Sequence, residues 1–297
     1  MRRTRTFIRF RVFLTVLTTI LVLGMAQHQS IWAKDNVDVG KMVKEMLTGR
    51  ETQTPIPCLT QTYGSFSMDK AYQIQATLAK KLSKKLGPVV GYKVAYASKA
   101  AQQQFGVDEP ASGPLFLLQR VPTGSKLPAH AFMELLIETE IAFTLSKRID
   151  RPIKDVAEIK DYVKWVHTAF DLSDERFVTG QTKPTPQDAI ANGVGAHFFV
   201  LGPAMDPSKV NVDAIIIKLI LNGKTITESP ATNVMGSPWN SLLWLANHVV
   251  KHGGTLEPGA VVLTGTAAKA YRAKGDQIKG LYEGDCGLLG KVILTSY

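Results

Sequence analysis

The chain has 297 residues, of which 45% are hydrophobic and 20% charged, a composition typical of a globular protein with a sizeable core. Its formal net charge of +10 includes five arginines in the first eleven residues, and without them 30 basic side chains remain against 25 acidic ones. No basic stripe with interleaved aromatic residues follows, so we expect no nucleic-acid partner.

The first 33 residues have the pattern of a secretory signal peptide. Basic residues precede an apolar stretch, 12–25, that is short for a bilayer span. We therefore expect export to the periplasm or the extracellular space, with a membrane contact only through this leader if it stays uncleaved. Cys58 and Cys286 could pair in an oxidising compartment, but two cysteines so far apart do not decide the matter.

The first third of the chain is predicted to be mainly helical. An amphipathic helix spans Met68–Leu86 and ends at Gly87-Pro88. The other elements expected here are a short helix around 39–47, a Pro-rich connection through 55–57, a buried strand at 89–96, a short helix at 98–105 and a loop at 106–113.

Strand patterns dominate from about residue 115. An exception is 155–169, where valines and isoleucine at helical spacing predict an amphipathic helix that runs into Phe170-Asp171-Leu172. Asn222-Gly223 predicts a hairpin turn, and Ser237-Pro238 predicts the start of a helix that runs through His252. Further strands are expected at 196–201, 214–221, 261–263 and 292–294. The result is an α+β fold in one domain, 34–297, with a helical part, 34–87, and a β-rich core, 88–297.

The most informative feature is the pair Glu138 and Glu140 in a strand-like run. Because side chains alternate between the two faces of a strand, both carboxylates share one face, roughly 7 Å apart. Ile141, Phe143 and Leu145 fill the other face and indicate packing on a core. Buried like charges must share a proton, meet a basic group or bind a metal. The pair therefore predicts a metal site or an acid/base site.

Asp171 is the natural third member of this acidic group. It lies between Phe170 and Leu172 in a short apolar segment, so in a strand it would point to the opposite face from these two side chains. Three carboxylates without histidine or thiol suit a hard cation such as Mg²⁺ or Mn²⁺. The spacing is equally compatible with Asp171 capping a turn while the glutamates face solvent.

Lys93 lies within a strongly apolar run, 89–96. A buried lysine needs a partner, and in a site it could polarise a carbonyl group or hold a substrate carboxylate. It could equally extend along the strand to the surface.

Several segments together resemble the 2-keto-4-pentenoate hydratase and 4-oxalocrotonate decarboxylase branch of the fumarylacetoacetate hydrolase superfamily. The resemblance runs in order over roughly residues 55–297 and is more specific than any single motif. The matching segments are 91–94, 98–100, 105–110, 113–116, 138–143, 171–176, 238–240, 244–247 and 258–265.

This resemblance implies a mixed β-roll or barrel-like core with flanking helices, and a homo-oligomer. It also implies Mg²⁺ or Mn²⁺ bound to the carboxylate and 2-oxo groups of a 2-oxo acid or its dienol, where the cation stabilises an enolate. The site residues that it implies are the metal ligands Glu138, Glu140 and Asp171, the catalytic Lys93 and Lys183, and the substrate-binding Asn192, Thr264 and Gly265. Thr264 and Gly265 follow a strand, and a plain strand exit fits them equally well.

Two departures from the family pattern bear on the reaction. Hydratases carry Pro-Asp-x-Gly, in which Asp is a proposed acid/base, whereas this chain has Pro110-Ala111-Ser112-Gly113. The segment after the family's Asn is altered to Gly193-Val194-Gly195. Family members are catabolic enzymes that normally work in the cytoplasm, so a secretory leader is a further departure.

We therefore expect a divalent-metal-dependent lyase of the 2-hydroxypenta-2,4-dienoate hydratase type. Three alternatives stay open from the sequence. They are a 4-oxalocrotonate-type decarboxylase, an acylpyruvate C–C hydrolase, and an exported non-catalytic protein that binds 2-oxo acids.

Overall fold

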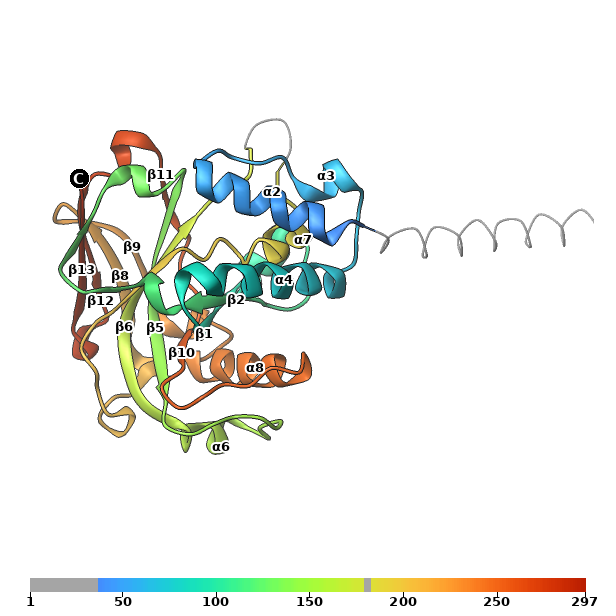
Figure 1. Ribbon diagram of the computed structural model, residues 1–297. Coiled ribbons are helices and arrows are strands. Elements are labelled where there is room, and N and C mark those ends of the chain that lie inside the picture. Colours follow the sequence, from blue (N-terminus) through green and yellow to red (C-terminus); the bar gives the residue numbers. More distant parts are fainter. Residues whose placement is uncertain (1–36, 179–182) are drawn as a thin grey trace, which may run out of the picture.

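The computed structural model describes residues 37–178 and 183–297, which form two β-sheets flanked by helices (Figure 1). The helices are α2 (Val39–Thr52), α3 (Leu59–Tyr63), α4 (Met68–Leu86), α5 (Lys99–Phe105), α6 (Val156–Lys160), α7 (Pro186–Ala191) and α8 (Pro238–Lys251). In this part of the chain, no helix is long and apolar enough to cross a membrane.

The larger sheet has the strand order β2-β1-β10-β5-β6-β7-β3, with β11 also pairing with β5. Its strands are β1 (Val89–Ala95), β2 (Ala111–Phe116), β3 (Arg120–Pro122), β5 (Leu135–Leu145), β6 (Val163–Asp174), β7 (Phe198–Leu201), β10 (Val261–Leu263) and β11 (Tyr271–Ala273). The smaller sheet has the order β4-β13-β12-β8-β9. Its strands are β4 (Ser125–Leu127), β8 (Ile216–Leu221), β9 (Lys224–Pro230), β12 (Gly280–Asp285) and β13 (Lys291–Ser296).

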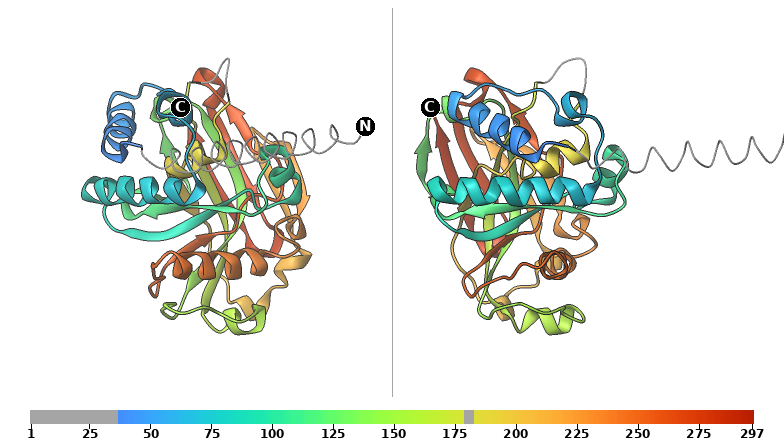
Figure 2. Two further views of the ribbon diagram at one scale, coloured as in Figure 1. Left: turned by 90° about the vertical axis from the view of Figure 1, so that its right-hand side faces the viewer. Right: turned by 45° about the vertical axis from the view of Figure 1, so that its right-hand side comes forward.

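The two faces of the β5–β6 pair have different roles. One face packs Ile137, Phe170 and Leu172 against Leu219 and Tyr282 of the smaller sheet. The N-terminal helices α2 and α4 lie on the far side of the larger sheet from the smaller one (Figures 1 and 2). The opposite face of β5–β6 carries the acidic side chains described below. On this face Glu140, Ala142, Ala169 and Asp171 are fully buried, so the site lies within the protein.

Helix α4 is attached to the sheet by an interior glutamine. Ser67 caps the helix by accepting from Lys70 N at 3.1 Å. Gln75 donates to the carbonyl groups of Ser112 and Ile190, each at 2.8 Å. One buried amide therefore joins α4 to β2 and α7, and the predicted helix at Met68–Leu86 is confirmed.

The hairpin and the late helix follow the sequence as predicted. Asn222 and Gly223 have φ of 50° and 78°, the positive values that a two-residue type I′ turn requires. Ser237 caps α8 by accepting from Trp239 N at 3.2 Å. Cys58 and Cys286 are both free and buried, so the structure contains no disulfide between them.

The helix predicted at 155–169 is wrong. Only Val156–Lys160 is helical; after a turn at 161–162 the chain enters β6 at Val163, and this strand pairs antiparallel with β5. Apolar residues at helical spacing also fit a strand that is buried on both faces. The run Val163–Phe170 is rich in β-branched and aromatic residues, which favour the sheet.

Candidate metal centre

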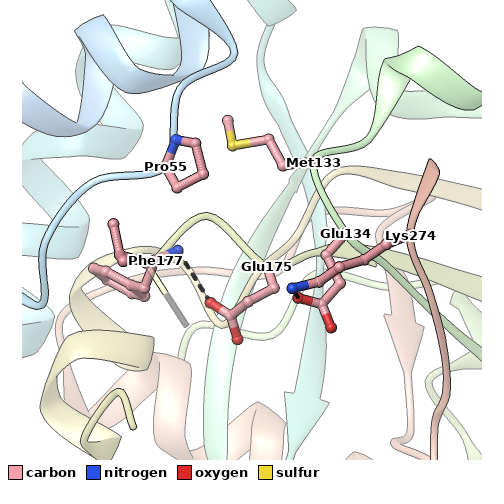
Figure 3. A pocket seen from close by; sticks show the side chains of 7 residues that line it. Pro55, Met133, Glu134, Glu175, Phe177 and Lys274 are labelled. Carbon is pink, nitrogen blue, oxygen red and sulfur yellow. Dashed lines mark hydrogen bonds and ion pairs between the residues drawn. The ribbon is translucent and has the colours of Figure 1, made fainter. Parts of the chain in front are cut away.

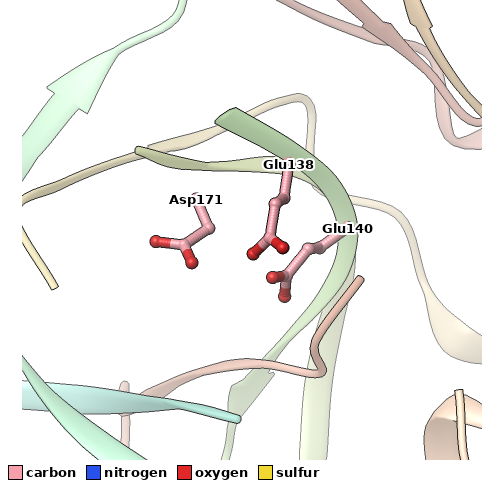
Figure 4. Close-up of side chains that lie close together, drawn as sticks. All are labelled: Glu138, Glu140 and Asp171. Carbon is pink, nitrogen blue, oxygen red and sulfur yellow. The ribbon is translucent and has the colours of Figure 1, made fainter. Parts of the chain in front are cut away.

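The structure brings three carboxylates together at the centre of the larger sheet. Glu138 of β5 lies directly opposite Asp171 of β6 in the ladder, and Glu140 is two residues further on the same face. One oxygen from each lies within 4.8 Å of the others, and the carboxylates converge (Figure 4). Glu140 and Asp171 are fully buried and Glu138 is half-buried. The alternative in which the glutamates face solvent is therefore excluded.

Two carboxylate oxygens in this cluster have no hydrogen-bond partner. They are Glu140 Oε1 and Asp171 Oδ1, both fully buried. Buried carboxylate oxygens without donors are costly, and a divalent cation satisfies both charge and coordination. An all-oxygen donor set suits a hard cation such as Mg²⁺ or Mn²⁺. The residues therefore fit a divalent metal.

The electrostatics of the cluster support the same conclusion. Burial, and next the negative charge of Asp171, raise the pKa of Glu138 to about 8. Burial, and then Asp171 and Glu138, raise the pKa of Glu140 well above its ordinary value. Without a cation, the cluster therefore holds protons at neutral pH.

Lys93 supplies the compensating charge. The side chain is 3% exposed and its Nζ forms an ion pair with Asp171 Oδ2 and donates to Ser173 Oγ at 2.5 Å. Burial lowers the pKa of Lys93, but the surrounding carboxylates, Asp171 first, together raise it above its ordinary value. The alternative in which Lys93 extends to the surface is excluded.

Gly265 contacts the cluster through its backbone. Its N–H donates to Glu140 Oε2 at 2.7 Å, and its φ is +91°. A Cβ atom here would lie 2.4 Å from Ala97 Cβ, so glycine is required for close approach. Thr264 is different, because its hydroxyl donates to the Ile141 carbonyl at 2.8 Å and so holds β10 to β5.

Residues 88–288 match the family model described as fumarylacetoacetate (FAA) hydrolase C-terminal. The chain belongs to this family. Two curated relatives are named as hydratases. The 2-keto-4-pentenoate hydratase of Paraburkholderia xenovorans (strain LB400) is 27% identical over 221 residues, 74% of this chain and 81% of the relative. The 2-hydroxyhexa-2,4-dienoate hydratase of Comamonas testosteroni is 26% identical over 249 residues, 82% of this chain and 92% of the relative.

A solved structure shows the same fold. The 4-oxalocrotonate decarboxylase from Pseudomonas putida G7, complexed with magnesium and adipate, has a TM-score of 0.79 at 20% identity. The match covers 87% of this chain and 97% of the decarboxylase. The predicted α+β fold of the FAA hydrolase family and the prediction of an enzyme of this family are confirmed.

The prediction of export is wrong. The family match and the relatives named as hydratases give no support to an exported protein. A basic stretch before apolar residues predicts a leader from composition alone, and composition does not determine where an enzyme works. The expected signal peptide, 1–33, lies outside the described residues.

Two other residues expected in the site, Asn192 and Lys183, are not part of the acidic cluster. Asn192 ends α7, is 3% exposed, and accepts from Arg50 Nη2 at its side-chain Oδ1 at 2.5 Å. Lys183 is exposed, and the described structure does not bring it into the buried cluster. Asp188 is buried and accepts four hydrogen bonds from the backbone and hydroxyl groups of Thr60 and Thr185.

Ala111 begins β2 opposite Ala95 and is 2% exposed. It packs in the apolar layer between the sheet and the N-terminal helices, with Phe66, Ala71 and Ile190 among its cluster. The alanine side chain is a methyl group and has no ionisable proton. This chain therefore has no acid/base group at the position that corresponds to the Asp of the hydratase pattern.

Ser173 was missed by the sequence analysis. Ser173 follows Asp171 by two residues on β6 and therefore shares its face of the strand. Its hydroxyl donates to Asp171 Oδ2 at 3.2 Å. Strand alternation from Asp171 would have found it, but the helix predicted up to this segment obscured the strand.

A second cluster of charged side chains lies at the end of the larger sheet where β5 begins. Glu134, 4% exposed, binds Arg272 Nη1 and Lys274 Nζ, both at 2.7 Å. Beside it is a cavity of about 260 Å³, where Pro55 and Met133 lie across from Glu175 and Lys274 (Figure 3). The cavity is lined by Pro55, Met133, Glu134, Glu175, Phe177, Val178 and Lys274. The lining holds two carboxylates, Glu134 and Glu175, and one ammonium group, Lys274. Arg272, which binds Glu134, is not one of the lining residues.

Proposed function

We propose that this chain is a divalent-metal-dependent lyase that acts on a 2-oxo acid or its dienol, with hydratase-like chemistry. The observation that carries the proposal is the buried triad Glu138, Glu140 and Asp171, with two unpartnered oxygens and Lys93 in contact. The names of the relatives, 2-keto-4-pentenoate hydratase and 2-hydroxyhexa-2,4-dienoate hydratase, support the substrate class.

Glu138, Glu140 and Asp171 would hold Mg²⁺ or Mn²⁺ on the face of β5–β6 that they share. The magnesium and calcium complexes of the structurally similar decarboxylase support this assignment. When bound, the cation would stabilise the negative charge that develops on the 2-oxo oxygen as the substrate changes between enol and keto forms.

Gly265 and Lys93 would position one metal ligand and hold a proton, respectively. Gly265 N–H fixes one oxygen of Glu140, and Lys93 holds a proton beside Asp171 in an enclosed environment. A protonated amine at this place can donate a hydrogen bond to the enolate oxygen and exchange a proton with it. Apolar side chains on the same face, Ala142, Ala169, Phe199 and Leu263, exclude bulk water from the reacting group.

We assign substrate contacts to Asn192 and Gly265, whereas Lys183, exposed and outside the buried cluster, is given no part in the chemistry. Arginine only donates hydrogen bonds, so Arg50 fixes Asn192 with Oδ1 toward it and leaves the amide N–H groups directed elsewhere. Thr264 would position the loop that carries Gly265, because its hydroxyl and its N–H both donate to the Ile141 carbonyl and its own carbonyl accepts from Ser241. We further propose that 34–297 forms one catalytic domain that assembles into a homo-oligomer.

A decarboxylase is the second candidate, and Ala111 favours it. Addition of water needs a group that moves a proton to or from water, and Ala111 cannot supply it. When CO₂ leaves from a second carboxylate of the substrate, the electron pair of the broken C–C bond delocalises to the 2-oxo oxygen as an enolate, which then takes up a proton. That reaction needs the charge stabilisation but no activated water. The fold that the chain shares with 4-oxalocrotonate decarboxylase is compatible with either reaction.

The test is turnover of 2-hydroxypenta-2,4-dienoate, followed as loss of conjugated-dienol absorbance with Mg²⁺, with Mn²⁺ and with chelator. Metal-dependent formation of 4-hydroxy-2-oxopentanoate supports a hydratase. Ketonisation without water addition, together with CO₂ release from 4-oxalocrotonate, supports the decarboxylase. Glu140→Gln should abolish either activity, and unchanged turnover by this variant would contradict the metal-centre mechanism.

A further inference from the structure

Ser173 is the second neighbour of the Lys93 ammonium group. Nζ of Lys93 donates to Ser173 Oγ at 2.5 Å and pairs with Asp171 Oδ2, and the Ser173 hydroxyl itself donates to Asp171 Oδ2 at 3.2 Å. The three side chains therefore form a closed ring of contacts. All are buried, with 3%, 6% and 0% exposure for Lys93, Ser173 and Asp171.

Two contacts determine the orientation of a tetrahedral ammonium group. Lysine has three N–H donors, and the contacts to Asp171 and Ser173 occupy two of them. The direction of the third N–H is then set by geometry. With Asp171 alone, the ammonium group could turn about its contact with Oδ2, and the third N–H would sweep over a cone.

We propose that Ser173 is a positioning residue, which holds the Lys93 amine so that its third N–H meets the reacting oxygen of the substrate. This inference rests on the proposed function, in which Lys93 exchanges a proton with a 2-oxo acid or dienol. Ser173 acts through Lys93 and need not touch the substrate.

The two oxygens of Asp171 explain why a hydroxyl is useful beside the ion pair. Oδ1 has no partner and is available to a cation, whereas Oδ2 binds both Lys93 and Ser173. A bound cation would draw negative charge from the Asp171 carboxylate and so weaken its ion pair with Lys93. The Ser173 hydroxyl is neutral and does not compete for the cation in this arrangement, so it keeps Lys93 in place.

The segment around Gly195 lies beside Ser173. A Cβ atom at Gly195 would lie 3.4 Å from Ser173 Cβ and 3.6 Å from its Oγ. Asp174 N, next to Ser173, donates to the Gly195 carbonyl at 2.9 Å. The segment between α7 and β7 is therefore joined to the backbone of β6 next to the serine.

The test compares Ser173→Ala with wild type in the metal-dependent assay above. We expect kcat to fall roughly tenfold or more, as for loss of one hydrogen bond to a charged group, with little change in KM. Ser173→Thr, which keeps the hydroxyl, should recover most of kcat. Ser296→Ala is the matched control, since it removes a buried hydroxyl of β13 that has no partner, and it should leave kcat unchanged.

A second readout does not depend on activity. Ser173→Ala, Lys93→Met and the double variant form a thermodynamic cycle for unfolding in metal-free protein, and we expect their effects not to add. Lys93→Gln replaces Lys93→Met if the latter does not fold. Additive effects, or wild-type kcat in folded Ser173→Ala, would overturn the inference. An inactive wild type would instead remove the proposed function, while the cycle still tests the contact.

Discussion

The backbone N–H of Gly265 donates to Glu140 Oε2 at 2.7 Å and leaves Oε1 of the same carboxylate without a partner. The loop after β10 therefore aims one oxygen of Glu140 into the acidic cluster. This contact depends on a φ of +91° and on the absence of a side chain beside Ala97 Cβ.

Gly265→Ala should weaken divalent-metal binding by more than tenfold and destabilise the fold. The new Cβ would lie 2.4 Å from Ala97 Cβ and 3.0 Å from the Val94 carbonyl oxygen, so the loop must move and Glu140 loses its donor. The lost hydrogen bond to a charged group alone is worth about 1.5–3 kcal/mol. Calorimetric titration with Mn²⁺ measures the affinity.

Gly259→Ala is the matched control for this variant. Gly259 also has positive φ, +87°, but a Cβ there meets no atom within 4 Å. Its substitution tests backbone strain without crowding. Equal losses of Mn²⁺ affinity in the two variants would show that strain, and not displacement of Glu140, is responsible.

The central acidic site could be predicted from the sequence because strand alternation is a local rule. Two glutamates at i and i+2 must share a face wherever the strand lies. The partner strand could not be predicted, because β6 has valines at a spacing that also suits a helix. What selects the strand is pairing with β5, a long-range interaction that local periodicity does not contain.

Contacts between segments far apart in the sequence could not be predicted for the same reason. Arg50 and Asn192 are 142 positions apart, and Lys93 and Ser173 are 80 apart. Their residue types are ordinary, so nothing in either segment marks it. The family resemblance located Lys93 and Asn192, but it did not indicate the side chains that hold them.

Metal binding should stabilise the protein more at pH 8 than at pH 5. A carboxyl group whose pKa is raised on folding, as for Glu138 at about 8, stabilises the fold fully below its unfolded pKa near 4.5. That contribution is lost as pH rises through 8, because the folded cluster must then carry its charges. Bound Mg²⁺ removes this penalty, so the gain in Tm from saturating Mg²⁺ over EDTA should grow across this range.

Glu138→Gln supplies the control for this pH dependence. It removes one of the titrating groups while keeping the shape of the side chain, so the metal-free Tm should vary less between pH 5 and pH 8. A gain from Mg²⁺ that is constant with pH in wild type would contradict the protonated cluster.

Asp188→Asn should destabilise the protein by about 2–4 kcal/mol, because it disrupts the hydrogen bonds that attach α3 to α7. The buried carboxylate accepts from Thr60 N and Oγ1 and from Thr185 N and Oγ1, all at 2.8 Å. In asparagine an NH₂ group replaces one of the two accepting oxygens. This donor would face the donors of Thr60 or Thr185, and buried N–H or O–H groups would be left without an acceptor. Urea unfolding measures the loss. Asp206→Asn, at an exposed 3₁₀-helix cap, should cost far less, and equal losses would refute the argument.

His197 should contribute to acid unfolding. Burial, and next the positive charge of Arg176, lower the pKa of His197 to about 3, and its Nε2 donates to the Ala131 carbonyl at 2.9 Å. The folded state thus keeps the ring neutral while the unfolded chain takes up a proton below pH 6.5. The contribution of the neutral ring to the free energy of unfolding is therefore fully present above pH 6.5. It falls as pH drops toward 3, at about 1.4 kcal/mol per pH unit.

His197→Gln keeps a donor for Ala131 and removes this titration. The free energy of unfolding in urea should then fall about 2 kcal/mol less between pH 6.5 and pH 5 than in wild type. His130→Gln, at an exposed position, should leave the wild-type pH dependence in place. If His197→Gln and wild type lose stability in parallel over this range, the ring is not kept neutral by burial and other groups drive the acid transition.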